Sequence, residues 1–121
     1  MIYKCTNPSC GCLTEEEAPP ALCPECGSSM REIREEEMTG RDWAALGGYW
    51  TGLRKNEKRI LYCYRMAAAK GNAWGICNLG WCMEAGVGID ADPKQAVWLY
   101  EQAAQAGYIP ALCNLAACLQ E

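Results

Sequence analysis

The sequence predicts a mainly α-helical protein in which a short solenoid of helical hairpins follows a small, cysteine-rich β unit. Two observations carry this prediction. Between positions 57–85 and 93–121, an offset of 36 residues, nine of the 29 compared residues are identical. A period of about 20 to 50 residues is typical of solenoids. In addition, the ten cysteines divide into an N-terminal cluster and scattered positions within the repeats.

Length and composition fit a globular chain with a core of its own. A compact fold of 121 residues buries roughly two-thirds of its unfolded surface. Half of the residues are apolar and 21% are charged, as is ordinary for such a domain. No apolar run approaches the ~18 residues that span a bilayer, and the first residues lack the apolar stretch of a signal peptide. We therefore expect a cytoplasmic protein with no membrane partner.

Charge is distributed unevenly along the chain. Residues 1–42 carry a formal charge of −5, and residues 43–121 carry +1. Proteins that bind nucleic acid neutralise its phosphates with clustered lysine and arginine side chains. The acidic N-terminal part argues against nucleic acid as a partner.

Residues 1–33 contain two turns that each bring two sulfurs together. The glycine after each pair is expected to relieve crowding where the chain reverses. The predicted metal ligands are Cys5 and Cys10 before Gly11, and Cys23 and Cys26 before Gly27. Cys12 is the alternative to Cys10, which is preferred because glycine follows it. Since the sequence has no histidine, the site can only be all-sulfur.

A closed site of four thiolates is the commonest structural use of zinc, which we therefore favour over iron. The competing interpretations are disulfides and a redox Cys-x-x-Cys motif, but the latter requires a βαβ context that the sequence lacks. In composition and spacing this segment resembles rubredoxin-like zinc ribbons. Short strands at 2–4 and 30–33 are expected to flank the two turns, and one structural Zn²⁺ is the expected metal. Four residues separate Cys5 from Cys10, and Cys12 stands where an aromatic residue is common.

Residues 34–56 connect this ribbon to the repeats. The run Glu35–Glu37 is a solvated linker or the start of a helix. Thr39 is a candidate N-cap for a helix that we expect to end at Gly52. Its apolar residues follow the spacing i, i+3, i+4, i+7 and form one stripe of Trp43, Leu46, Gly47 and Trp50.

Residues 57–121 are predicted to form two helical hairpins. The first pairs a helix after Asn56, ending at Lys70, with a second helix over 73–85. The two-residue gap between these helices allows only an antiparallel arrangement. The second hairpin begins with Asp92 as N-cap and Pro93 at N1, and its last helix opens at Pro110. Expected packed residues are Ile60, Tyr64, Ala67, Ala68, Ile76, Leu79, Gly80, Met83, Ala96, Leu99, Tyr100, Ala103, Ala104, Leu112, Leu115, Ala116 and Leu119.

These repeats resemble Sel1-like repeats, a family of TPR-like helical hairpins. The resemblance is carried by residues 96–107, by Asn78-Leu79-Gly80 and by the Gly86-Val-Gly88-Ile loop. Residues 43–52 are similar to the second helix of a preceding partial repeat. The resemblance implies a superhelix whose first helices line a concave surface that binds a protein or peptide. The chain departs from the family pattern at Cys63, Met83 and Leu99.

Two rows of equivalent residues are candidates for partner binding. Tyr62 and Trp98 follow Leu61 and Val97, off the main packing stripe. A pair of aromatic side chains there suits an apolar or peptide ligand; packing against the ribbon or a loop is the alternative. Asn78 and Asn114 could bind a ligand backbone or tie their helices to neighbouring segments.

The remaining cysteines, Cys12, Cys63, Cys77, Cys82, Cys113 and Cys118, are expected to be free thiols that act as small apolar residues. Disulfides within each hairpin, as in secreted relatives of this repeat, are the alternative. Cys77 and Cys82 cannot bond each other, because they lie about 140° apart around one helix.

The sequence favours a non-enzymatic protein-interaction adaptor, with the partner bound on the groove of the repeats and with a structural zinc ribbon. It has no histidine, no evident nucleophile and base, and no phosphate-binding glycine loop. The alternative is that the ribbon itself acts, in nucleic-acid binding or in rubredoxin-like electron transfer. The last predicted helix has no polar cap, which suggests a homo-oligomer through that helix or a longer natural chain.

Overall fold

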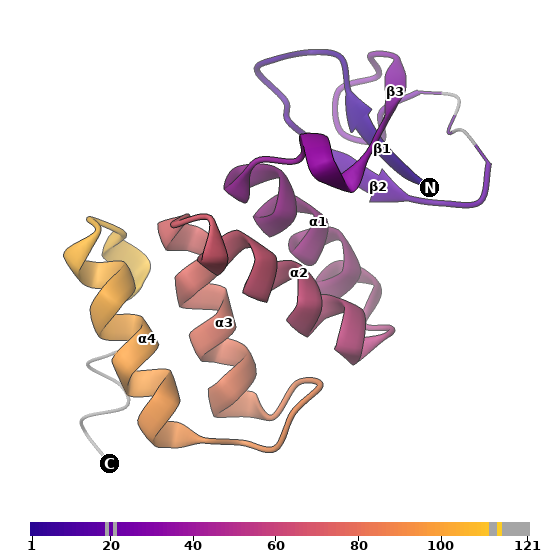
Figure 1. Ribbon diagram of the computed structural model, residues 1–121. Coiled ribbons are helices and arrows are strands. Elements are labelled where there is room, and N and C mark those ends of the chain that lie inside the picture. Colours follow the sequence, from indigo (N-terminus) through magenta and orange to yellow (C-terminus); the bar gives the residue numbers. More distant parts are fainter. Residues whose placement is uncertain (19, 21, 112–113, 115–121) are drawn as a thin grey trace.

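The computed structural model describes residues 1–18, 20, 22–111 and 114. Three short strands are followed by four long helices (Figure 1). The strands β1 (Ile2–Cys5), β2 (Leu13–Glu15) and β3 (Met30–Ile33) form an antiparallel sheet in the order β2-β1-β3. The central strand β1 and the edge strand β3 were predicted, whereas the other edge strand, β2, was not.

The long helices are α1 (Gly40–Leu53), α2 (Glu57–Ala69), α3 (Ala73–Ala85) and α4 (Pro93–Gln105), and a 3-10 turn η1 (Glu35–Glu37) precedes them. Each long helix starts at a side chain that accepts a hydrogen bond from the amide three residues on; these caps are Thr39, Asn56, Asn72 and Asp92. The predicted end of α1 at Gly52 was wrong by one residue. The helix continues through Leu53 and ends at Arg54, whose φ is 51°.

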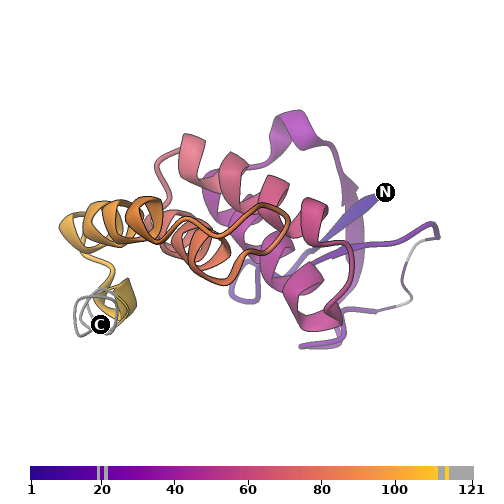
Figure 2. The same ribbon diagram turned by 90° about the horizontal axis from the view of Figure 1, so that it is seen from below.

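The helices pack as antiparallel neighbours that follow one another away from the strands, with α4 farthest from the sheet (Figure 2). Close packing depends on small residues. A Cβ added to Gly80 would lie 2.9 Å from Cε1 of Tyr100, so only glycine lets α4 approach α3 this closely. Of the residues predicted to face inward on α3, Leu79 and Gly80 are buried and Ile76 and Met83 are half-buried.

One apolar cluster joins the sheet to the helices. It comprises Ile2, Leu13 and Ile33 from the strands, Met38 from the connector, and Trp43, Ala44, Leu46, Cys63 and Ala67 from α1 and α2. Trp43 is fully buried at its centre. The sheet therefore shares its core with the first two helices.

Ion pairs reinforce this junction. Lys4 on β1 lies 2.9 Å from the carboxylate of Asp42 on α1. Burial alone would raise the pKa of Asp42, but hydrogen bonds from Lys4 and Thr39 outweigh burial and hold it below its usual value. Glu15 on β2 accepts two hydrogen bonds from Arg59 of α2, at 3.0 and 3.1 Å, and one from Nε1 of Trp50 at 2.8 Å.

The last predicted helix lies largely outside the described residues, as do its expected inward residues Leu112, Leu115, Ala116 and Leu119. Association through that helix stays a prediction. In the part of the chain that the structure describes, no helix is long and apolar enough to cross a membrane.

Candidate metal centre and helical face

The two N-terminal turns bring four sulfurs together. The Sγ atoms of Cys5, Cys10, Cys23 and Cys26 all lie within 4.8 Å of one another. Cys5 is 3.4 Å from Cys26, and Cys10 is 3.7 Å from Cys23. A tetrahedral zinc thiolate site with Zn–S bonds of about 2.3 Å has sulfur-to-sulfur distances of about 3.8 Å. The cluster is therefore compatible with one metal ion held by these four residues.

Backbone amides point at all four sulfurs. The amides of Asn7 and Glu25 each lie 3.4 Å from the sulfur two residues earlier, on Cys5 and Cys23. The amide of Cys12 likewise donates to Cys10, and the amide of Ser28 donates to Cys26. Each donor partly neutralises the negative charge of a thiolate. The loops are shaped to hold deprotonated sulfur, which is the form that binds metal.

Both glycines after the cysteine pairs have a left-handed backbone, with φ of 66° at Gly11 and 77° at Gly27. A Cβ at either position would meet no other part of the protein within 4 Å, so the crowding that glycine relieves here is that of a Cβ with its own backbone. What the turns require is positive φ, which other residues adopt at a cost.

The four thiols differ in acidity. Hydrogen bonds from the hydroxyl and amide of Ser28 lower the pKa of Cys26 to about 6. Burial, together with the neighbouring cysteines, raises the pKa of Cys5 to about 12. The cluster thus combines the acidic, exposed thiol of Cys26 with the buried thiol of Cys5. The Cys5 thiol is expected to lose its proton readily only when a metal ion displaces it.

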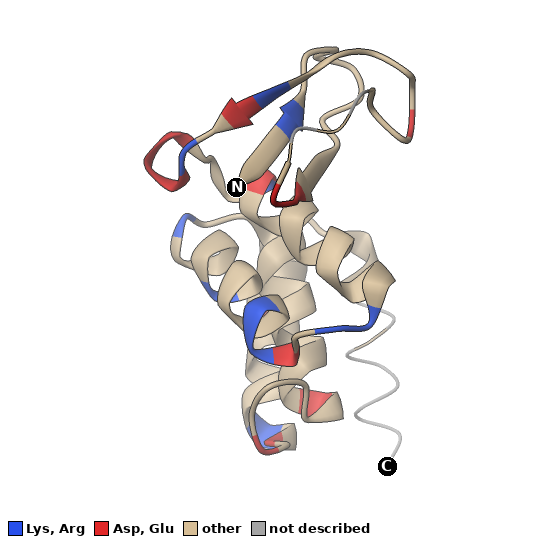
Figure 3. Cartoon of the chain, turned by 90° about the vertical axis from the view of Figure 1, so that its right-hand side faces the viewer, with Lys and Arg blue, Asp and Glu red and all other residues tan. Residues whose placement is uncertain are grey.

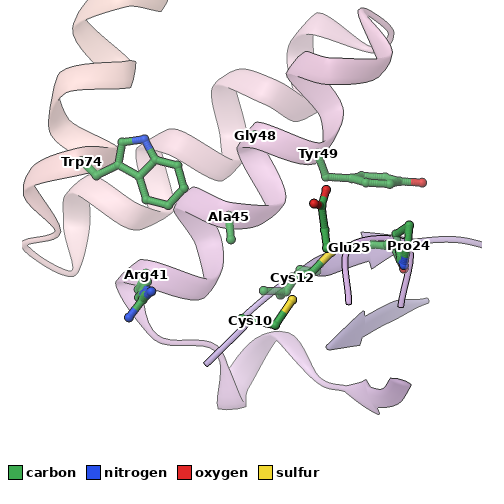
Figure 4. Close-up of a pocket in the computed structure, with 12 residues that line it drawn as sticks. Cys10, Cys12, Pro24, Glu25, Arg41, Ala45, Gly48, Tyr49 and Trp74 are labelled. Carbon is green, nitrogen blue, oxygen red and sulfur yellow. The ribbon is translucent and has the colours of Figure 1, made fainter. Parts of the chain in front are cut away.

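Cys12 lies outside the four-sulfur cluster, on the wall of a cleft of about 470 Å³ between the metal-site loops and the helices (Figure 4). The cleft is lined by Cys10, Cys12, Pro24 and Glu25 from the loops, Arg41, Ala45, Gly48 and Tyr49 from α1, and Trp74 from α3. Burial and the nearby Cys23 raise the pKa of Cys12 to about 12. The Cys12 thiol therefore lies beside the four-sulfur cluster without being one of its four members.

A pair of serine variants separates the roles of Cys10 and Cys12. We expect Cys10→Ser to lose bound metal, because it removes one of the four clustered sulfurs. Cys12→Ser should retain about one metal ion per chain. Metal content after gel filtration, measured by mass spectrometry, checks this; loss of the metal in the Cys12 variant alone would assign the ligand role to Cys12.

The predicted partner-binding aromatics are exposed. Tyr62 on α2 is 42% exposed and Trp98 on α4 is 54% exposed. The ring of Tyr62 packs edge-on against Trp43 at 5.5 Å, and the guanidinium of Arg59 lies 5.2 Å from its centroid. Tyr62 is therefore held in place from one side while its other side remains open.

The two asparagines proposed to bind a partner, Asn78 and Asn114, lie in different surroundings. The amide of Asn114 donates to the sulfur of Cys77 on α3 at 3.4 Å, so it contacts the neighbouring helix. Asn78 on α3 is half-buried. A role for either residue in partner binding stays a prediction.

The described cysteines of the helices, Cys63, Cys77 and Cys82, are buried and form no disulfide. Burial raises the pKa of Cys63 and of Cys82 to about 12, so both remain protonated. Cys113 and Cys118 lie outside the described residues.

Comparison with known proteins identifies the helical part. The model of the Sel1 repeat family matches residues 44–72 and 75–108, together more than half of the chain. The crystal structure of a Sel1 repeat protein from Oxalobacter formigenes is similar, with a TM-score of 0.59 and 29% identity over 63% of this chain. The match covers 32% of that chain, so this sequence corresponds to about a third of its length. No curated protein matches the sequence.

Proposed function

Since the chain belongs to the Sel1 repeat family, we propose that it is a non-enzymatic adaptor that binds a protein or peptide on the face formed by α2 and α4. The observation that carries this proposal is the exposure of Tyr62 and Trp98. Large aromatic side chains are enriched among the residues that dominate binding energy at protein interfaces. Two of them recur here at the same position of successive repeats.

In this proposal, residues 1–33 form a rubredoxin-like zinc ribbon whose Zn²⁺ is bound by Cys5, Cys10, Cys23 and Cys26. The metal would supply structural rigidity. The four sulfurs fix the two turns, the turns fix β1 and β3, and these strands carry Ile2 and Ile33 into the core shared with Trp43. The ribbon would thus cover apolar surface of α1 that would otherwise face water.

The adaptor function is tested by replacing the two aromatics. A partner recovered from the native cell by co-purification should bind the Tyr62→Ala, Trp98→Ala variant at least tenfold more weakly, because most of the apolar contact area is removed. Trp81→Ala is the matched control, since Trp81 is a 36% exposed tryptophan on α3, which is not one of the two helices that form this face. Equal binding by the wild type and the double variant, with unchanged helicity, would refute the groove as the binding site.

A second function, electron transfer by a bound iron, is supported by the same sulfur cluster and its amide donors, because four thiolates also suit iron. Protein purified from its native cell separates the two. A colourless protein with one zinc ion supports the adaptor, and a red protein that bleaches on reduction supports the electron carrier.

A further inference from the structure

The exposed face of α2 and α4 carries cations as well as aromatics. On α2, Lys58, Tyr62 and Arg65 follow the spacing i, i+4, i+7, which places them on one side of a helix. At the offset of one repeat, α4 presents Lys94, Trp98 and Glu101. We refer to these six residues as the cation–aromatic face.

All six side chains of this face are exposed. Their helices share one buried cluster, to which α2 contributes Leu61 and α4 contributes Leu99. Leu61 precedes Tyr62 and Leu99 follows Trp98, so each aromatic residue is next in sequence to a member of this cluster. The cation–aromatic face therefore lies on two helices that cover one buried cluster.

The cations of this face have no acidic partner within the described residues: Lys58, Arg65 and Lys94 form no ion pair there. By contrast, the cations at the junction of the sheet and the helices form ion pairs. Lys4 is paired with Asp42, and Arg59 is paired with Glu15 and Glu35. Three cations against the single acid Glu101 leave the face with a formal charge of +2 on a chain whose net charge is −4.

The geometry points to an acidic, extended peptide segment as the occupant of this face, with carboxylates against Lys58, Arg65 and Lys94 and apolar side chains against Tyr62 and Trp98. We infer this partner class from charge complementarity, and the inference rests on the proposed adaptor function. Complementary charge steers association and excludes partners of the wrong sign. Aromatic rings of fixed orientation provide apolar contact at a small entropic cost.

A peptide is favoured over nucleic acid, although both are anionic. The acidic turn η1 borders the face, because Glu35 lies 3.5 Å from Arg59 and Arg59 lies against Tyr62. Figure 3 shows the acids of η1 at the end of the molecule that holds the strands. A long polyphosphate chain would meet these carboxylates, whereas a short segment can place its acids on the cations alone.

The probe is a fluorescein-labelled peptide of about ten residues that alternates glutamate with leucine and tryptophan, compared with matched peptides in which lysine or glutamine replaces glutamate. Binding is measured by fluorescence anisotropy with the full chain loaded with zinc. We expect the glutamate peptide to bind and the lysine peptide not to bind. Raising salt from about 50 mM to about 300 mM should weaken the interaction severalfold, because the Debye length shortens.

The variant Lys58→Glu, Arg65→Glu, Lys94→Glu should bind the glutamate peptide at least tenfold more weakly. The control variant Arg31→Glu, Arg41→Glu, Arg54→Glu makes the same change in net charge at three exposed positions outside the face and should bind as the wild type does. Circular dichroism establishes that both variants keep their helices.

Three results would overturn the acidic-peptide inference: no binding of the glutamate peptide, equal binding of the glutamine peptide, or equal weakening by the two triple variants. Tighter binding of a single-stranded oligonucleotide than of the peptide would also overturn it. If a native partner depends on Tyr62 and Trp98 but not on the three cations, the adaptor function holds and only the acidic partner class fails.

Discussion

Removal of the metal proposed at the four-cysteine cluster is expected to destabilise the whole chain and not only the N-terminal loops. Without an ion, only weak hydrogen bonds would hold the four sulfurs within 4.8 Å of one another, and we expect the turns that position β1 and β3 to loosen. Structural zinc contributes on the order of 10 kcal/mol to the folding of small domains. Because the sheet supplies Ile2, Leu13 and Ile33 to the core around Trp43, we expect a loss of at least about 3 kcal/mol, or a fall in Tm of about 10–15 °C.

Differential scanning calorimetry before and after treatment with a zinc chelator measures this effect, and adding zinc back should restore the original Tm. Cys12→Ser loaded with zinc is the control, because it removes a thiol that lies outside the cluster. An unchanged Tm in the metal-free protein would show that the sheet is held by its apolar contacts alone.

Replacement of Trp43 by alanine should cost about 3–5 kcal/mol of the free energy of unfolding. This side chain is fully buried, contacts the ring of Tyr62 at 5.5 Å, and lies beneath the guanidinium of Arg59 at 5.8 Å. Its loss leaves a cavity where the sheet, α1 and α2 meet. Denaturant unfolding followed by circular dichroism provides the measurement.

Trp43→Phe is the informative companion variant. The Nε1 atom of Trp43 is buried without a hydrogen-bond partner among the described residues, so phenylalanine removes an unsatisfied donor while keeping most of the ring. We expect this variant to lose less than about half of what the alanine variant loses. If the alanine variant unfolds in two separate transitions, the sheet and the helices are independent units; a single transition indicates one cooperative core.

The helices could be predicted because their signals are local. Asn56 and Asp92 cap the helices they precede, and the offset of 36 residues places the same apolar side chains on both hairpins. The sulfur cluster could be predicted because two short turns, each with glycine next to its second cysteine, dictate where the sulfurs lie. The helix passes through Gly52 because one glycine costs a helix only about 1 kcal/mol.

The junction could not be predicted in the same way. β2 has three residues, too few for an alternating pattern to be visible. The contact between Glu15 and Arg59 joins residues 44 positions apart, and nothing near either residue indicates the other. The pairing follows from the way the sheet sits on α1, which is a property of the assembled core.

The apolar cluster shared by the sheet and α1 also determines at which end of the helical array further repeats can be added. Counted back by one repeat from α2, a helix would fall at residues 21–33, where the chain instead forms the second cysteine turn and β3. Leu13 and Ile33 of the strands pack in one cluster with Trp43 of α1, so the sheet already covers apolar surface of that helix. Further hairpins should therefore be easier to add by engineering on the C-terminal side of the array, where each new repeat would lengthen the proposed binding face without disturbing the cysteine turns.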